Sequence, residues 1–325
     1  MTAAPRSSSL FGSGRDAVAH LHRGRGVIVD CHTHTWDASQ LGHEVDFAVR
    51  QALLGASAAR GQAAATVDQL LAGSKPVDKS FILGFTSRLL DVELPNDQVA
   101  AVVRQHPDRL IGFAGIDPTD GPSARAELRR AREQLGLRGV ALSPAAQGYH
   151  PSDTRALAVF DEAARLRMPV LLHPGAHSAV ASRMEFARPI LLDEIAREFP
   201  MLKIIVAHLG YPWIDECVVL LGKHPNVFAD VSALLHRPFE AYRALVTCHE
   251  SGVIEKLLFG SDFPQMSATA CIEALYNVNK VAQGTGLPMI PRQLLQGIVE
   301  RDALPLLGLG PAAAPRTALL DDHDE

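Results

Sequence analysis

Short apolar runs alternate along this chain with longer amphipathic stretches. Within each run the apolar residues are continuous instead of alternating with polar ones, which is typical of parallel strands buried on both faces. Eight such runs predict strands, at residues 26–32, 80–85, 109–115, 138–143, 169–174, 203–208, 226–231 and 256–262.

The stretches between these runs have helical spacing, and several open with a capping residue or a proline. They predict helices at residues 96–105, 122–134, 153–167, 189–198, 267–281 and 292–304. Strands that alternate with helices in this way predict an α/β fold, the (β/α)8 TIM barrel. The segment from Trp36 to about Ala65 is too long for a simple loop, so we expect an inserted helix after the first strand. The last helix, 292–304, is expected to pack outside the barrel.

The two ends of the chain differ in composition from its middle. Residues 1–24 are rich in Ser, Gly, Arg and Ala, and the stretch from Gly308 has small residues, prolines and an acidic end. Such segments favour flexible arms. We therefore expect a flexible arm at 1–24, one barrel domain at 25–307 and a flexible tail at 308–325.

Charge and cysteine content narrow the class of partner. The 31 basic and 36 acidic residues give a net charge of −5, without a dense basic run. Nucleic acids and anionic membranes are therefore poor partners for this chain. The four cysteines show no CxxC spacing, and neither a signal peptide nor a membrane span of about 18 apolar residues is evident. A cytoplasmic protein that acts on a small molecule is the expectation.

Candidate chemistry lies where predicted strands end. In a (β/α)8 barrel these ends converge on one mouth, and residues i and i+2 of a strand share a side. Imidazoles with one carboxylate suit Zn²⁺ or another first-row divalent metal. Taken singly, each residue has an ordinary structural explanation, such as a core histidine or a helix-capping aspartate. Together they predict a metal site, and they are His32, His34, His173, His208 and Asp262.

The order of these motifs resembles a known family. HTH is followed by LRGVALSP, VLLHPG, KIIVAHLGYPW, HPNVFADVS and LLFGSDFP, roughly from Val27 to Pro305. This order is similar to the amidohydrolase-related metal-dependent barrels, in the branch with aminocarboxymuconate semialdehyde decarboxylase and γ-resorcylate decarboxylase. The resemblance also implies a homodimer, for which no separate signature is evident.

The resemblance implies a role for each site residue. His32, His34, His173 and Asp262 would hold the metal, and His208 would be the catalytic histidine at its open side. Some superfamily members bridge two metals with a carboxylated lysine on strand 4, but RGVALSPAA has no lysine. We therefore expect one divalent metal ion, zinc as the first candidate and manganese as the second.

Two reactions are compatible with these residues. In the first prediction, a hydrolase, metal-activated water attacks a small amide, ester or lactone. Asp262 accepts the proton of that water, and His208 forms a hydrogen bond with the oxyanion or with the attacking water. The alternative is a non-oxidative decarboxylase (carboxy-lyase) of an aromatic or enol carboxylic acid, in which protonated Asp262 protonates the carbon that loses CO₂. A remote third hypothesis is a metal-binding barrel without catalysis.

Loops at the same mouth carry candidate substrate contacts. An arginine in these loops, Arg88, Arg183 or Arg237, would bind a substrate carboxylate through two hydrogen bonds. Asp30 is expected either to orient a metal-bound histidine or to anchor the barrel floor, and Cys31 to be core. The candidate substrate contacts are Trp36, Arg88, Tyr149, His177, Trp213 and His236.

Overall fold

The computed structural model describes residues 26–36, 65–173 and 179–310. Eight parallel strands form one sheet in the order β1-β2-β5-β6-β7-β8-β9-β10. All eight runs predicted as strands lie in this sheet, although most strands are shorter than predicted. The strands are β1 Val29–Thr33, β2 Lys79–Leu83, β5 Leu110–Gly115, β6 Gly139–Leu142, β7 Val170–Leu172, β8 Ile204–Val206, β9 Val227–Asp230 and β10 Leu257–Leu258.

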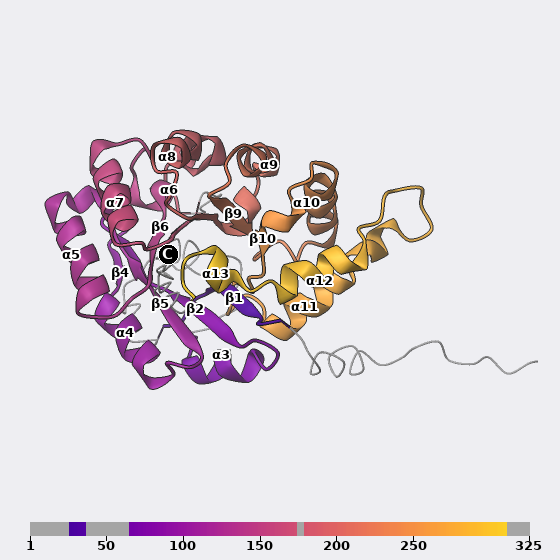
Figure 1. Cartoon of the computed structure of the whole chain (residues 1–325), viewed down its shortest axis with the longest axis horizontal. Coiled ribbons are helices and arrows are strands. Elements are labelled where there is room, and N and C mark those ends of the chain that lie inside the picture. Colours follow the sequence, from indigo (N-terminus) through magenta and orange to yellow (C-terminus); the bar gives the residue numbers. More distant parts are fainter. Residues whose placement is uncertain (1–25, 37–64, 174–178, 311–325) are drawn as a thin grey trace, which may run out of the picture.

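The two edges of this sheet meet. The Cys31 N–H donates to the Phe259 carbonyl at 2.9 Å, and the His34 N–H donates to the Phe263 carbonyl at 2.9 Å. The first strand therefore lies beside the last, and the sheet closes into the predicted TIM barrel. Figure 1 shows the strands in the middle of the molecule with helices around them.

The helices predicted between strands are present. Residues 189–198 begin with a 3₁₀ turn before α8, and residues 267–281 form α11 followed by a 3₁₀ segment. The expected inserted helix between Trp36 and Ala65 lies outside the described residues. The helices are α3 Val67–Gly73, α4 Asn96–Gln105, α5 Pro122–Glu133, α6 Pro144–Gln147, α7 Thr154–Arg165, α8 Leu192–Glu198, α9 Ile214–Lys223, α10 Pro238–Glu250, α11 Ala268–Tyr276, α12 Arg292–Glu300 and α13 Ala303–Leu306.

One hairpin was not predicted. Strands β3 (Phe85–Ser87) and β4 (Val92–Leu94) pair antiparallel after β2. Each has three residues, too few for a recognisable apolar pattern.

Every barrel strand contributes to an interior cluster of buried apolar side chains. At its centre the rings of Phe81 and Phe113 stack with centroids 4.6 Å apart. A Cβ atom on Gly139 would lie 2.3 Å from the Phe113 ring. Glycine is required there because the Phe113 ring occupies the space of a side chain.

The end of the described chain closes this interior from one side. Ala303, Leu307 and Leu309 belong to the interior cluster, and Arg138 Nη2 donates to the Leu309 carbonyl at 2.7 Å. The expectation that residues 292–304 form one helix outside the barrel is therefore wrong at its end. Helix α12 packs beside α11, whereas α13 lies across the centre of the strands (Figure 1).

None of the helices in the described ranges combines the length and apolar character needed to cross a membrane.

Candidate metal centre

An irregularity in β1 directs His32, and His34 just after the strand, toward the mouth of the barrel. Val29 and Cys31 belong to the interior cluster, so strict alternation would direct His32 and His34 to the other side of the strand. The pairing of β1 with β2 shifts register between Asp30 and Thr33. Such bulges re-aim side chains beside active sites, and this one accounts for both histidines facing the mouth.

The other site residues follow their strands in different ways. His173 comes two residues after Leu171 of the interior cluster, so strand alternation directs both side chains to the same, inner side. His208 comes just after β8 and has φ +55°, in the left-handed region, as does the next residue, Leu209. Asp262 also has a positive φ, +58°. Left-handed conformations of non-glycine residues cost about 1–3 kcal/mol and cluster at functional sites.

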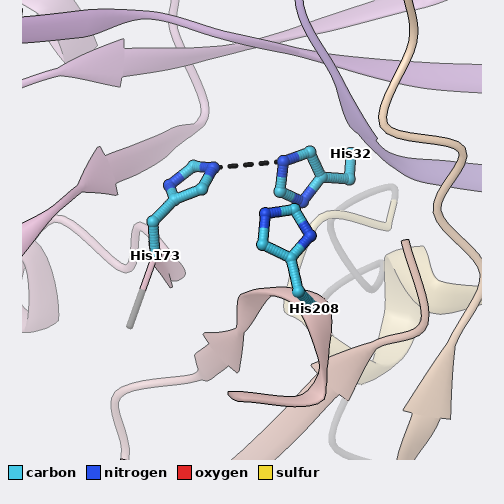
Figure 2. A group of neighbouring side chains, drawn as sticks. All are labelled: His32, His173 and His208. Atoms are coloured by element: carbon cyan, nitrogen blue, oxygen red, sulfur yellow. Dashed lines mark hydrogen bonds between the residues drawn. The ribbon is translucent and has the colours of Figure 1, made fainter. Parts of the chain in front are cut away.

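Nitrogen atoms from three strands meet around His32. Its Nε2 lies 3.1 Å from Nε2 of His34 and 3.1 Å from Nε2 of His173. Asp262 Oδ1 lies 3.6 Å from Nε2 of His32 and 3.8 Å from that of His34. A ring nitrogen of His208 is within 4.8 Å of those of His32 and His173, whose rings Figure 2 shows grouped with that of His208.

This donor set fits a divalent metal. His32 directs Nδ1 at the Asp230 carboxylate, 3.0 Å from Oδ2, so in the neutral ring Nε2 carries the lone pair. Burial, together with the charges of His32 and His208, holds the pKa of His34 well below its usual range, which keeps that ring neutral. Neutral imidazole nitrogens 3.1 Å apart repel unless a proton or cation lies between them. With the Asp262 carboxylate they form a nitrogen–oxygen set suited to zinc or manganese.

Asp230, the last residue of β9, supports this cluster. Burial alone would lower the pKa of His32, but the charge of Asp230 and its hydrogen bond raise that pKa. Conversely, burial would raise the pKa of Asp230, but His32 lowers it. A carboxylate on Nδ1 fixes the tautomer and orientation of a metal-binding histidine. Sequence reasoning missed Asp230, although it lies at the end of a predicted strand like the residues that were selected.

The two other buried aspartates differ. Burial raises the pKa of Asp262 to about 7, against the opposing charge of His32. Asp30 does not contact an imidazole: its Oδ1 accepts from the backbone N–H groups of Ser261 at 2.9 Å and His32 at 3.3 Å. These bonds tie β1 to the residue before Asp262, at the mouth of the barrel and not at its floor. Cys31 is fully buried, as expected of core.

The candidate substrate contacts differ in how far they are exposed to solvent. Trp36 is 4% exposed and Tyr149 only 2%, and both pack in the outer hydrophobic core. Arg88 is largely exposed and pairs with Asp120 at 2.6 Å. Trp213 is half-buried and His236 exposed, whereas His177 lies outside the described residues.

Arg237 has the clearest relation to the site. Its guanidinium lies over the ring of Tyr211, 4.9 Å from the centroid, and donates to the Ala233 carbonyl at 2.9 Å. Its charge is near enough to Asp262 to act against the raised pKa of that carboxyl.

Two comparisons of the sequence with known proteins found similarity, one to a protein family and one to a curated protein. The family model described as amidohydrolase matches residues 29–303. A 2-amino-3-carboxymuconate-6-semialdehyde decarboxylase from Dictyostelium discoideum is 24% identical over 201 residues, which cover 52% of this chain and 55% of the relative. The chain thus spans about half the length of the curated relative it matches.

Solved structures share the fold. A dihydroxybenzoic acid decarboxylase from Polaromonas, with bound manganese and the inhibitor 2-nitroresorcinol, has a TM-score of 0.59 and 16% identity and covers 88% of this chain and 98% of its own. A probable 2-pyrone-4,6-dicarboxylic acid hydrolase from Acinetobacter baumannii, with citric acid bound, has a TM-score of 0.57 and 17% identity, covering 86% and 99%. Because the family model matches most of the chain in one continuous stretch, the chain belongs to the amidohydrolase family.

Proposed function

We propose that this protein is a metal-dependent carboxy-lyase that removes CO₂ from a small aromatic or enol carboxylic acid. The observation that carries the proposal is the convergence of four groups. They are the Nε2 atoms of His32, His34 and His173 and the carboxylate of Asp262. Hydrolysis was the first prediction from sequence. The similarity to a decarboxylase over 201 residues, and to a manganese-containing decarboxylase in fold, supports placing decarboxylation first.

His32, His34, His173 and Asp262 are the proposed ligands of one divalent ion, zinc or manganese. When bound, such an ion would supply Lewis-acid chemistry, polarising a substrate oxygen beside the carboxylate and stabilising developing negative charge. The nitrogen-rich donor set supports zinc. The manganese bound to the Polaromonas decarboxylase supports manganese equally.

Asp262 is the proposed proton donor. Its side chain is 8% exposed and lies within 4 Å of two of the site's imidazoles. In the proposed step the bond between the substrate carbon and its carboxylate breaks, CO₂ leaves, and the proton of Asp262 goes to that carbon. Solvent water then reprotonates Asp262.

Arg237 is the proposed contact for an acidic substrate. The ring of Tyr211 and the Ala233 carbonyl hold its guanidinium in place. A fixed planar guanidinium binds a carboxylate through two parallel hydrogen bonds, which suits a substrate that carries one.

Hydrolysis of a lactone, ester or amide is the second candidate. It uses the same residues, with Asp262 accepting the proton of the attacking water and His208 accepting a hydrogen bond from that water. The fold similarity to a pyrone dicarboxylic acid hydrolase favours it over other reactions.

The test separates the two reactions. Protein loaded with zinc or manganese is incubated with hydroxybenzoic acids, with labelled bicarbonate plus phenols, and with lactones. We expect CO₂ release, and label in the phenol. Hydrolysis of lactones alone would replace the first candidate by the second, and no turnover of either class would contradict both. The Asp262→Asn variant is expected to lose either activity.

A matched experiment tests the metal site. His34→Ala is expected to lose most of the one equivalent of metal that the parent protein binds, because it removes one of the converging Nε2 atoms. Elemental analysis measures this, with His150→Ala as control, because His150 is exposed and lies outside the cluster. Full metal content in His34→Ala would contradict the proposed ligand set.

A further inference from the structure

His208 has a partner that neither the sequence nor the family match assigns. Its Nδ1 lies 2.8 Å from the hydroxyl oxygen of Ser232, two residues after the end of β9. The same hydroxyl makes a short hydrogen bond with Asp230 Oδ1. Ser232 is fully buried, so solvent does not compete for this contact.

The donors and acceptors of this chain of contacts can be assigned. Asp230 Oδ1 accepts the backbone N–H of His208 at 3.1 Å and that of Ser232 at 3.1 Å. Since an N–H group only donates, Oδ1 is an acceptor, and the single hydroxyl proton of Ser232 must point to it. The hydroxyl oxygen can then only accept from the ring of His208. The proton of a neutral His208 therefore lies on Nδ1.

We propose that Ser232 is a positioning residue that fixes His208 in the Nδ1–H tautomer and so leaves the lone pair on Nε2. This inference deepens the proposed function, on which it rests, because it defines what His208 offers a substrate: an acceptor, able to take a proton. In the neutral state, Nε2 of His208 does not donate.

Asp230 applies the same control to two rings. Its Oδ2 accepts a hydrogen bond from Nδ1 of His32 at 3.0 Å. Its Oδ1 accepts one from the hydroxyl of Ser232, and that hydroxyl in turn accepts one from Nδ1 of His208. Both rings thereby carry their lone pairs on Nε2. The backbone N–H of His208 also binds Asp230, which holds the left-handed turn that presents this ring.

Close packing keeps the three side chains in place. A Cβ atom on Gly260 would lie 3.0 Å from Cβ of His32, 3.1 Å from Cβ of Ser232 and 3.4 Å from Cβ of Asp230. The absence of a side chain at residue 260 therefore lets these groups approach β10. A serine, whose hydroxyl both donates and accepts, fits between Asp230 and His208, whereas alanine would remove the acceptor of His208 Nδ1–H and one donor to Asp230.

The tautomer can be observed without any substrate. Long-range ¹H–¹⁵N spectra of zinc-loaded protein with labelled histidines separate protonated from unprotonated ring nitrogens, and His208→Gln identifies the signals of His208. We expect Nδ1–H in the parent protein and in Ser232→Thr, which keeps the hydroxyl, and a shift toward Nε2–H in Ser232→Ala. Ser74→Ala, which removes a fully buried hydroxyl elsewhere, should leave the signals unchanged.

Several outcomes would overturn the proposal. An Nε2–H tautomer in the parent protein would do so even if Ser232→Ala failed to fold, and so would an unchanged tautomer in a folded Ser232→Ala. With an identified substrate, kcat of Ser232→Ala should fall about 10–100-fold with little change in KM, and Ser232→Thr should restore it. A parent protein with Nδ1–H but no turnover of either substrate class would refute the proposed function and leave the tautomer assignment standing.

Discussion

At the scale of residues, the site depends on fully buried side chains outside the predicted set of metal ligands. Asp230 binds the ring of His32, the backbone of His208 and both the backbone and hydroxyl of Ser232. Outer partners of metal-binding histidines set the tautomer, and their loss weakens metal binding. Asp230 and Ser232, which are not among the predicted ligands, therefore orient the rings of the histidines at this centre.

Asp230→Asn tests this dependence. An amide nitrogen opposite Nδ1 of His32 would favour the opposite tautomer, with a proton on Nε2, where the metal is proposed to bind. We expect zinc affinity to fall about 10–100-fold, measured by competition with a chromogenic chelator. Asp97→Asn serves as control, because Asp97 is an exposed partner of Arg130. Equal zinc affinity in Asp230→Asn and the parent protein would refute the role of this carboxylate.

At the scale of elements, strands bring the site residues together, but local departures from regularity aim them. The register shift in β1 turns His32 and His34 inward, and left-handed residues after β8 and β10 present His208 and Asp262. The apolar pattern predicted each strand because burial on both faces requires continuous apolar residues. It carried no sign of these irregularities, because an apolar run records burial and neither strand register nor the sign of φ.

Two glycines within elements predict opposite effects of alanine. In β6, Gly139→Ala would press a methyl group into the Phe113 ring, whereas Gly297 in α12 has its nearest neighbour at 3.6 Å. We expect Gly139→Ala to destabilise the fold by about 1–3 kcal/mol through overpacking. Gly297→Ala should stabilise it by about 0.5–1 kcal/mol through helix propensity. Urea unfolding of both variants measures this, and equal midpoints would contradict it.

At the scale of the whole molecule, the interior cluster of buried apolar side chains and the candidate metal centre lie at opposite ends of the barrel. The interior cluster is covered by α13 and Leu309, while the strand ends with His173, His208 and Asp262 form the opposite mouth. In (β/α)8 barrels the chemistry lies at the carboxyl ends of the strands and the other face serves stability. Substitutions at α13 should therefore alter unfolding without altering metal binding.

Adjacent leucines in this segment make a matched pair. Leu307 is 1% exposed within the interior cluster, whereas Leu306 is 37% exposed. We expect Leu307→Ala to lose about 2–5 kcal/mol of unfolding free energy. Leu306→Ala should stay within about 0.5 kcal/mol of the parent protein. Thermal unfolding with parallel zinc titrations tests both expectations. Equal losses from the two variants, or loss of zinc binding in a folded Leu307→Ala, would count against this separation.

The sequence by itself predicted the eight strands, six of the eleven helices in the described residues, and the five residues His32, His34, His173, His208 and Asp262 that converge at the mouth. It could do so because burial and helical spacing leave a local record in residue type, and because strand ends in a barrel must converge. Only the tertiary structure revealed the contacts of Asp230, Ser232 and α13. Their contacts join segments far apart in the chain, as between Asp230 and His32, and no local pattern specifies which distant group a buried side chain will meet.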